Sequence, residues 1–264
     1  MKNLFLLFII VVLSGCSNGF SKYYQGENLI ENKNEASNYE MTEDVKSAPL
    51  PNSPLELTIL RAFADGYYAI GGSYWHGPKE EGRDEAISQA KKVGASLVLW
   101  SDEYTYTSQG VSAIPIYTPG TTSTRMYSGL FTGSLSGIYY GSSTTYNPGR
   151  FATTYVPYSE NIYEYRALFF AKLKKDDSKL YIIPIEVPNI IKSKIGMNKG
   201  IFVASVMKGS VPYRADILVG DVIISINNQD IDINSKLYTI ITSGENTFKI
   251  WRDGKIFEKK VYFK

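Results

Sequence analysis

The chain has 264 residues, of which 44% are hydrophobic and 20% charged, a composition typical of globular proteins and large enough for two domains. The formal net charge of +2, without a basic stripe in the sequence, argues against nucleic acid as a partner. The 21 tyrosines favour a structure rich in strands.

The N-terminal segment has the pattern of a signal peptide. An apolar run from Leu4 to Leu13 is long enough for the hydrophobic region of a signal and too short to span a bilayer. The run ends in the letters LSGC, which resemble the lipobox of bacterial lipoproteins. The resemblance implies that residues 1–16 are a lipoprotein signal, that Cys16 is acylated, and that this lipid binds the protein to a membrane. In the same family, Ser17 after the cysteine favours the outer membrane, facing the periplasm or the cell surface.

The next segment, residues 17–54, is predicted to be a flexible tether. It is rich in Asn, Glu, Ser and Lys, contains three prolines near its end, and has few large apolar side chains. Such a composition buries too little apolar surface to fold alone. We therefore expect a spacer that lifts the folded part of the chain off the lipid surface.

Residues 55–175 are expected to form a small α/β domain, the first part of an α+β protein. Residues 55–75 predict two strands joined by the turn dipeptide Asp65-Gly66. Apolar residues at three- and four-residue steps predict a helix of about ten to twelve residues that ends before Gly94. Two further stretches predict strands of the same sheet, 96–107 and 161–175.

Residues 105–158 form an insertion rich in Ser, Thr, Gly and Tyr, without Asp, Glu or Lys. The pattern fits either a long β-hairpin or a poorly ordered loop. An adhesive arm that pairs with another chain or with glycan is one functional interpretation, and a variable loop without such a role is the other. The adhesive interpretation would make the protein a structural or adhesive surface lipoprotein.

The C-terminal part, residues 179–264, contains the stretches GIFVASVMKGSVPYRADILVGDVIISINNQDI and FKIWRDGKIFEKKVYF. Their order resembles a PDZ domain of the permuted bacterial type found in HtrA proteases. The resemblance implies a β-sandwich or barrel with two helices, which binds an extended peptide by adding it as a strand to an open sheet edge. A helix from Asn234 to about Thr242 would form one wall of the groove. The residues expected at the groove are Leu180, Tyr181, Ile182, Ile183, Leu237, Ile240 and Ile241.

The loop expected to bind a peptide carboxylate departs from this family. Relatives have a glycine in the loop, which lets successive amides converge on an anion, whereas residues 180–183 contain none. Pro184 also removes one backbone donor from the strand that follows. Three alternatives stay open: capture of a free C-terminus, contact with another protein segment, and a purely structural groove.

The chain has no recognisable catalytic pattern. His76 is the only histidine, and no protease-like serine motif, phosphate-binding loop or dinucleotide-binding turn is present. One histidine and one cysteine are too few for an ordinary zinc site. We expect a non-enzymatic adaptor that uses no cofactor or metal and binds a protein or peptide partner. A hydrolase in the first domain is the remaining alternative, and it requires a deep pocket with polar groups around His76 or at the acidic helix start.

Overall fold

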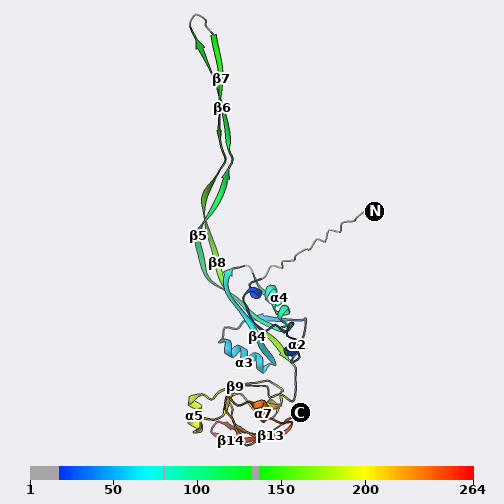
Figure 1. The fold of residues 1–264 in the computed structure, drawn as a ribbon. Helices are drawn as coiled ribbons and strands as arrows, with labels where there is room; N and C mark the ends of the chain where they lie inside the picture. Colours follow the sequence, from blue (N-terminus) through cyan, green and yellow to red (C-terminus); the bar gives the residue numbers. More distant parts are fainter. Residues whose placement is uncertain (1–17, 80, 133–136) are drawn as a thin grey trace, which may run out of the picture. The chain divides into compact units, whose positions relative to one another are not determined.

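The computed structural model describes residues 18–79, 81–132 and 137–264 (Figure 1). The chain forms two compact units, one made of residues up to Glu103 and from Tyr163 onward, the other of Tyr104–Ile162. The expected signal and lipobox, Cys16 included, lie outside the described residues. Within the described ranges, no helix has the length and apolar character needed to cross a membrane.

A mixed sheet forms the α/β part of the first unit. Its strand order is β1-β4-β8-β5-β3, and β2 pairs with β8. Strand β3 runs parallel to β5, whereas β1 and β2 pair antiparallel with β4 and β8. The elements of this part are α1 (Gly19–Lys22), β1 (Tyr24–Gly26), α2 (Lys33–Ala36), β2 (Tyr39–Glu40), β3 (Lys46–Pro49), α3 (Leu55–Ala64), β4 (Tyr67–Pro78), α4 (Arg83–Val93), β5 (Leu97–Thr118) and β8 (Arg150–Leu173).

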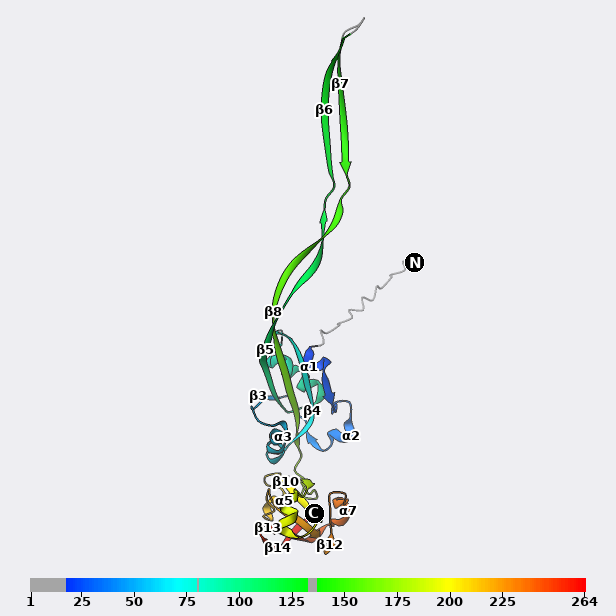
Figure 2. The same cartoon turned by 90° about the vertical axis from the view of Figure 1, so that its left-hand side faces the viewer.

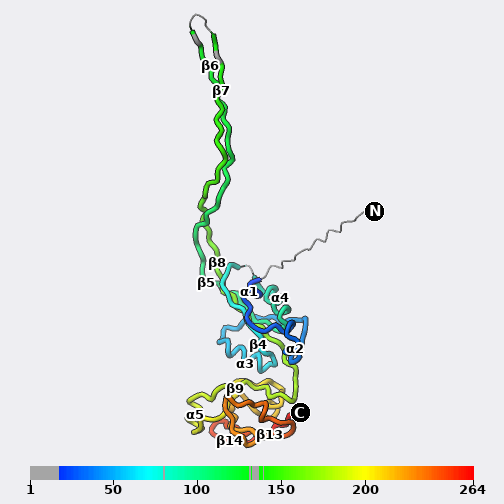
Figure 3. Tube along the Cα trace, in the orientation of Figure 1, coloured from blue at the N-terminus to red at the C-terminus, as the bar shows by residue number. Residues whose placement is uncertain are grey.

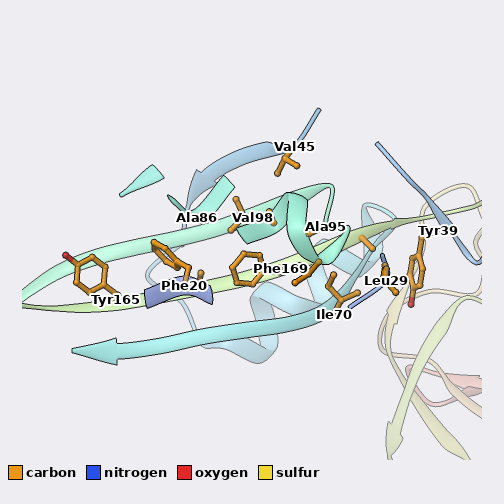
Figure 4. Close-up of a cluster of buried hydrophobic side chains, with 14 residues drawn as sticks. Phe20, Leu29, Tyr39, Val45, Ile70, Ala86, Ala95, Val98, Tyr165 and Phe169 are labelled. Atoms are coloured by element: carbon orange, nitrogen blue, oxygen red, sulfur yellow. The ribbon is translucent and has the colours of Figure 1, made fainter. Parts of the chain in front are cut away.

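Helix α4 confirms the helix predicted from the apolar periodicity. Ala86, Ala90 and Val93 are buried on one face, as their spacing predicts. Gly94 ends the helix in the left-handed conformation at φ 78°, which costs glycine little. The buried face packs with Val98 and other apolar residues of the sheet in a single core (Figure 4).

The prediction of a flexible tether over residues 17–54 is wrong for residues 18–54, because they form two helices and three strands of the α/β part. Phe20 is completely buried, and its ring lies 4.7 Å from that of Trp75 in an edge-to-face arrangement. Leu29 and Tyr39 are buried in the same core (Figure 4). The segment has few apolar residues, but each fills a core that other strands build, and composition alone does not show this.

The first of the two strands predicted after residue 55 is also wrong, because residues 55–64 form helix α3. Thr58, Ala62 and Phe63 are buried on one face of this helix, a spacing that fits a helical period better than a strand. Asp65 and Gly66 do form a turn, with Gly66 at a φ of 85°, but it joins helix α3 to a strand and not two strands. The second predicted strand corresponds to β4.

The insertion forms a hairpin and not a disordered loop. Strands β5 and β8 extend out of the α/β sheet, and β6 (Thr121–Phe131) and β7 (Gly137–Asn147) continue the arm as an antiparallel pair. Figure 2 shows β6 and β7 as a long, twisted two-stranded ribbon, and Figure 3 traces the same two segments side by side. We call residues 104–162 the arm.

The C-terminal part has a second sheet with the order β14-β13-β11-β10-β9, and β12 pairs with β11. Its elements are β9 (Ile182–Glu186), α5 (Asn189–Ile195), β10 (Ile201–Val206), α6 (Val211–Arg214), β11 (Val222–Ile226), β12 (Gln229–Asp230), α7 (Leu237–Ile240), β13 (Gly244–Arg252) and β14 (Lys255–Phe263). This part contains three short helices where two were predicted. The additional helix, α5, packs Ile191 and Ile195 against the face of the sheet that contains Trp251.

The helix predicted over residues 234–242 is shorter than expected. It begins after Lys236 and not at Asn234. Asp232 explains the difference, because its side chain accepts hydrogen bonds from the backbone N–H of Asn234 and from the hydroxyl of Ser235, which form a turn.

Replacement of Phe20 tests whether the N-terminal segment is part of the folded core. We expect Phe20→Ala to lower the free energy of unfolding by about 3–5 kcal/mol, because it leaves a cavity in a closed core. Ile30→Ala is the control, since Ile30 is 52% exposed and its replacement should change the value by less than about 0.5 kcal/mol. Urea denaturation measures both. Equal, small effects of the two changes would contradict a folded N-terminal segment.

Candidate functional site

Five of the seven predicted groove residues pack against one hydrophobic cluster. Strand β9 and the residue two positions before it contribute two of them, and α7 with the residue after it contributes three. All five pack, partly buried, against a cluster that includes Ile201, Val203 and Phe248. We call them the groove surface: Leu180, Ile182, Leu237, Ile240 and Ile241.

Strand β9 is the edge strand of its sheet. One of its edges pairs antiparallel with β10, and within the described residues no strand pairs with the other edge. The backbone N–H of Met207 donates to the carbonyl of Tyr181 at 3.1 Å, so the backbone carbonyl of Tyr181 points toward the β10 side of the strand. Because alternate residues of a strand direct their backbone groups to opposite edges, Ile182 and Glu186 direct theirs to the open edge. The open edge therefore offers backbone donors and acceptors to an added strand.

Pro184 follows the same alternation. It pairs with Val203 across the strands, and the backbone N–H of Val203 donates to Asp221 of the neighbouring segment instead. The donor that Pro184 lacks would therefore lie at the open edge, where proline is tolerated. An added strand loses one hydrogen bond there, but it can still use the N–H groups of Ile182 and Glu186.

Tyr181 compensates for the glycine that the loop lacks. It adopts a φ of 37°, a left-handed conformation that a residue with a side chain rarely takes. Its hydroxyl donates to the carbonyl of Lys174, and burial, followed by the nearby charge of Asp176, raises the pKa of this hydroxyl. The phenol stays protonated, so it keeps a hydrogen bond that offsets part of the backbone strain. The loop thus reaches a glycine-like conformation without a glycine.

Ile183 and Tyr181 do not join the groove surface. Ile183 lines an apolar cavity of about 390 Å³, together with Ile182 and Pro184 of the same strand, Ile59 and Phe63 of α3, and residues 67–69 of β4. Two hydrogen bonds also join the β10 region of the second sheet to helix α3. The hydroxyl of Ser205 donates to the carbonyl of Leu60 at 2.8 Å. The backbone N–H of Lys208 donates to the carbonyl of Ala64 at 2.9 Å. Residues 182–184 of β9 therefore face the α/β part across this cavity.

Two asparagines hold α7 in place, a role that no local sequence pattern indicates. Asn227 lies in the turn between β11 and β12, at a φ of 52°. Its side-chain amide also donates to the carbonyl of Ile240 at 3.2 Å and to the side chain of Asn246 at 2.8 Å. Asn246 is fully buried and bonds to the N–H and carbonyl of Thr242, just after α7. These contacts fix the C-terminal end of the groove wall.

The hydrolase alternative requires a pocket around His76. The imidazole lies 3.3 Å from the carboxylate of Glu164, which also pairs with Arg166 and accepts from the hydroxyl of Tyr74 at 3.0 Å. Partial burial alone would raise the pKa of Glu164, but the hydrogen bonds from Arg166 and Tyr74 outweigh it and hold the pKa below its usual value. A cavity of about 400 Å³ adjoins this cluster, and His76 is not among the residues that line it.

No group of acidic, histidine or cysteine residues in the described parts of the chain could hold a metal ion. The acidic start of α4 is used structurally, since the carboxylate of Glu85 accepts from the N–H of Gly82 at 2.9 Å.

Comparison with known proteins identifies a PDZ domain at residues 183–237. Among solved structures, the HtrA3 PDZ domain bound to a phage-derived ligand is similar at 19% identity, with a TM-score of 0.28, over 31% of this chain and 81% of that one. The HtrA-type protease AlgW with a decapeptide is similar at 18% identity, with a TM-score of 0.27, over 36% of each chain. This chain thus spans about a third of the length of that protease. No curated protein matches the chain.

Two replacements of Tyr181 test the origin of the loop conformation. Tyr181→Gly removes the backbone strain and also the hydrogen bond to Lys174, so we expect a free energy of unfolding within about 1 kcal/mol of the wild type. Tyr181→Val loses the hydrogen bond and keeps a β-branched residue at positive φ, so we expect it to cost about 2 kcal/mol more than the glycine variant. Urea denaturation of both variants distinguishes the two effects. Equal stabilities would show that the left-handed conformation is unimportant.

Proposed function

We propose that the protein is a non-enzymatic, lipid-anchored adaptor of the cell envelope whose PDZ domain binds an extended peptide segment of a partner protein. One observation carries the proposal: among the described residues β9 has no partner strand along one edge, and residues of β9 and α7 pack against the same hydrophobic cluster. Strand addition supplies backbone hydrogen bonds, and an apolar surface beside the edge supplies side-chain contacts.

The shape of the loop before β9 favours a peptide that ends at the groove. Tyr181 adopts a left-handed backbone conformation immediately before Ile182, the first residue of β9. In that conformation, the N–H of Ile182 lies at the open edge, where a terminal carboxylate can accept a hydrogen bond. An apolar last side chain would then contact Leu180 and Leu237 of the groove surface. We therefore favour a free C-terminus with an apolar last residue over an internal loop.

A peptide-binding assay tests the proposal with two neighbouring replacements. Leu237→Lys places a charge on the groove surface, and we expect it to weaken binding at least about tenfold, since burying an unpaired charge is costly. Tyr238→Lys is the matched control, because Tyr238 follows in the same helix and is 76% exposed, so binding should change less than about twofold. Fluorescence anisotropy with peptides selected from a C-terminal display library measures both.

The same assay with amidated peptides tests the role of the carboxylate. We expect amidation to weaken binding about tenfold or more, because a charged acceptor is replaced by a neutral one. Equal binding of acid and amide would favour an internal segment as the ligand. Equal binding of the Leu237→Lys and Tyr238→Lys variants would contradict the groove as the site.

The lipid anchor belongs to the same proposal and rests on the sequence LSGC at residues 13–16. Asn18, only two positions after Cys16, is already the N-cap of α1, and its side chain accepts from the N–H of Ser21 at 2.8 Å. An acyl anchor on Cys16 would thus hold the α/β part close to the lipid surface, without the spacer that the sequence predicted. Ser17 leads us to propose the outer membrane.

Metabolic labelling of cells with a palmitate analogue tests the anchor. We expect the wild-type chain to incorporate the label and to partition into the detergent phase. Cys16→Ser should lose both properties, because the only thiol of the chain is removed. A Cys16→Ser chain that still carries the label would contradict acylation at this residue.

A further inference from the structure

We infer that two copies of this chain associate through their arms, by antiparallel pairing of β7 with β7. Within the described residues, β6 and β7 form a sheet of two strands, so β7 pairs with β6 along one edge and leaves the other edge open. A two-stranded ribbon is marginally stable alone, and additional strands increase its stability.

The open edge of β7 lacks the usual protection against strand pairing. Proteins protect open edges with charged residues or prolines. Strand β5 contains Pro115, β6 contains Arg125, and β8 contains Arg150 and Pro157, whereas β7 contains neither a charge nor a proline. Among the four strands of the arm, β7 is therefore the one whose edge is open to another strand.

The residues of β7 also complement a second copy of themselves. Pairing centred on Ser142, the midpoint of the strand, places Ser142 opposite its own equivalent and Ile138 of one copy opposite Tyr146 of the other. Pairs of an aromatic and a β-branched residue stabilise antiparallel strands. The pairing also brings no like charges together, because β7 has none.

The exposure of this part of the arm favours a partner as well. Alternate residues of a strand share a face, and the register of the ribbon places Ile138 opposite Leu130 and Ser142 opposite Met126. One face of the ribbon therefore has five large apolar or aromatic side chains among serines and threonines, and these five are more than half exposed: Met126, Leu130, Ile138, Tyr140 and Tyr146. Pairing of two β7 edges brings these faces side by side in one four-stranded sheet.

The symmetry of the contact predicts a dimer. The same edge is used by both copies, so the contact is related by a two-fold axis and closes on itself. The outer edges of the four-stranded sheet would then be the two β6 strands, each with Arg125 near its middle. This role is narrower than a general adhesive function of the insertion, since the partner is the chain itself.

Disulfide crosslinking tests the position of the contact, in full-length chains that carry Cys16→Ser to remove the native thiol. Directly opposite residues of antiparallel strands are close enough for a disulfide, so we expect Ser142→Cys to give a covalent dimer under mild oxidation. Met126→Cys is the matched control, because Met126 is the register partner of Ser142 and is 87% exposed. In the proposed dimer, two copies of residue 126 are three strand spacings apart, roughly 14 Å, and should not crosslink. Equal crosslinking of both variants, or none, would overturn the proposal.

A second pair of replacements tests the edge without a thiol. Thr144 and Thr124 are register partners whose hydroxyls lie 3.1 Å apart, so a lysine at either position removes the same contact within the ribbon. We expect Thr144→Lys to shift the chain from dimer to monomer in sedimentation velocity, whereas Thr124→Lys leaves the dimer intact, with matching circular dichroism spectra. A monomeric wild-type chain would refute the proposal and would leave a glycan or a different protein as the partner of the arm. The same effect of both lysines would refute it too.

Discussion

Unpaired strand edges are the constraint on which the rest of this structure depends. A backbone N–H or C=O at an edge needs a hydrogen-bond partner from water or from another chain, and a partner strand satisfies a whole row of them. Among the strands that the structure describes, β9 in the C-terminal part and β7 in the arm each leave such a row open. The surroundings of each edge determine which partner fits it.

The two edges differ in what lies beside them. Residues of β9 and α7 pack against one hydrophobic cluster, and hydrogen bonds of Asn227 and the buried Asn246 fix the C-terminal end of α7. A preformed surface of this kind suits a peptide, because little ordering is needed upon binding. The edge of β7 has no such wall, and its side chains are small, uncharged or aromatic. A strand with the same properties is the partner that we propose there.

The sequence predicted the second sheet better than the first, for a physical reason. Turn residues, such as Gly220 and Asn227, set the boundaries of β11 locally, and both adopt positive φ. The N-terminal segment has no comparable local signal. Its apolar residues are few, and Phe20 becomes buried only because α4 and the sheet enclose it. The segment before β9 shows the same limit, since no local pattern indicates the positive φ of Tyr181 or the hydrogen bond from its hydroxyl to Lys174.

Amide hydrogen exchange along β9, measured with and without a bound peptide, tests the central claim most directly. The claim is that a peptide adds to the open edge as a strand. It predicts that the amides of Ile182 and Glu186, which face this edge, exchange more slowly when peptide is bound. The amides of Ile183 and Ile185, which face β10, should already be protected and should change little. A bound peptide that leaves the exchange of Ile182 and Glu186 unchanged would contradict the claim.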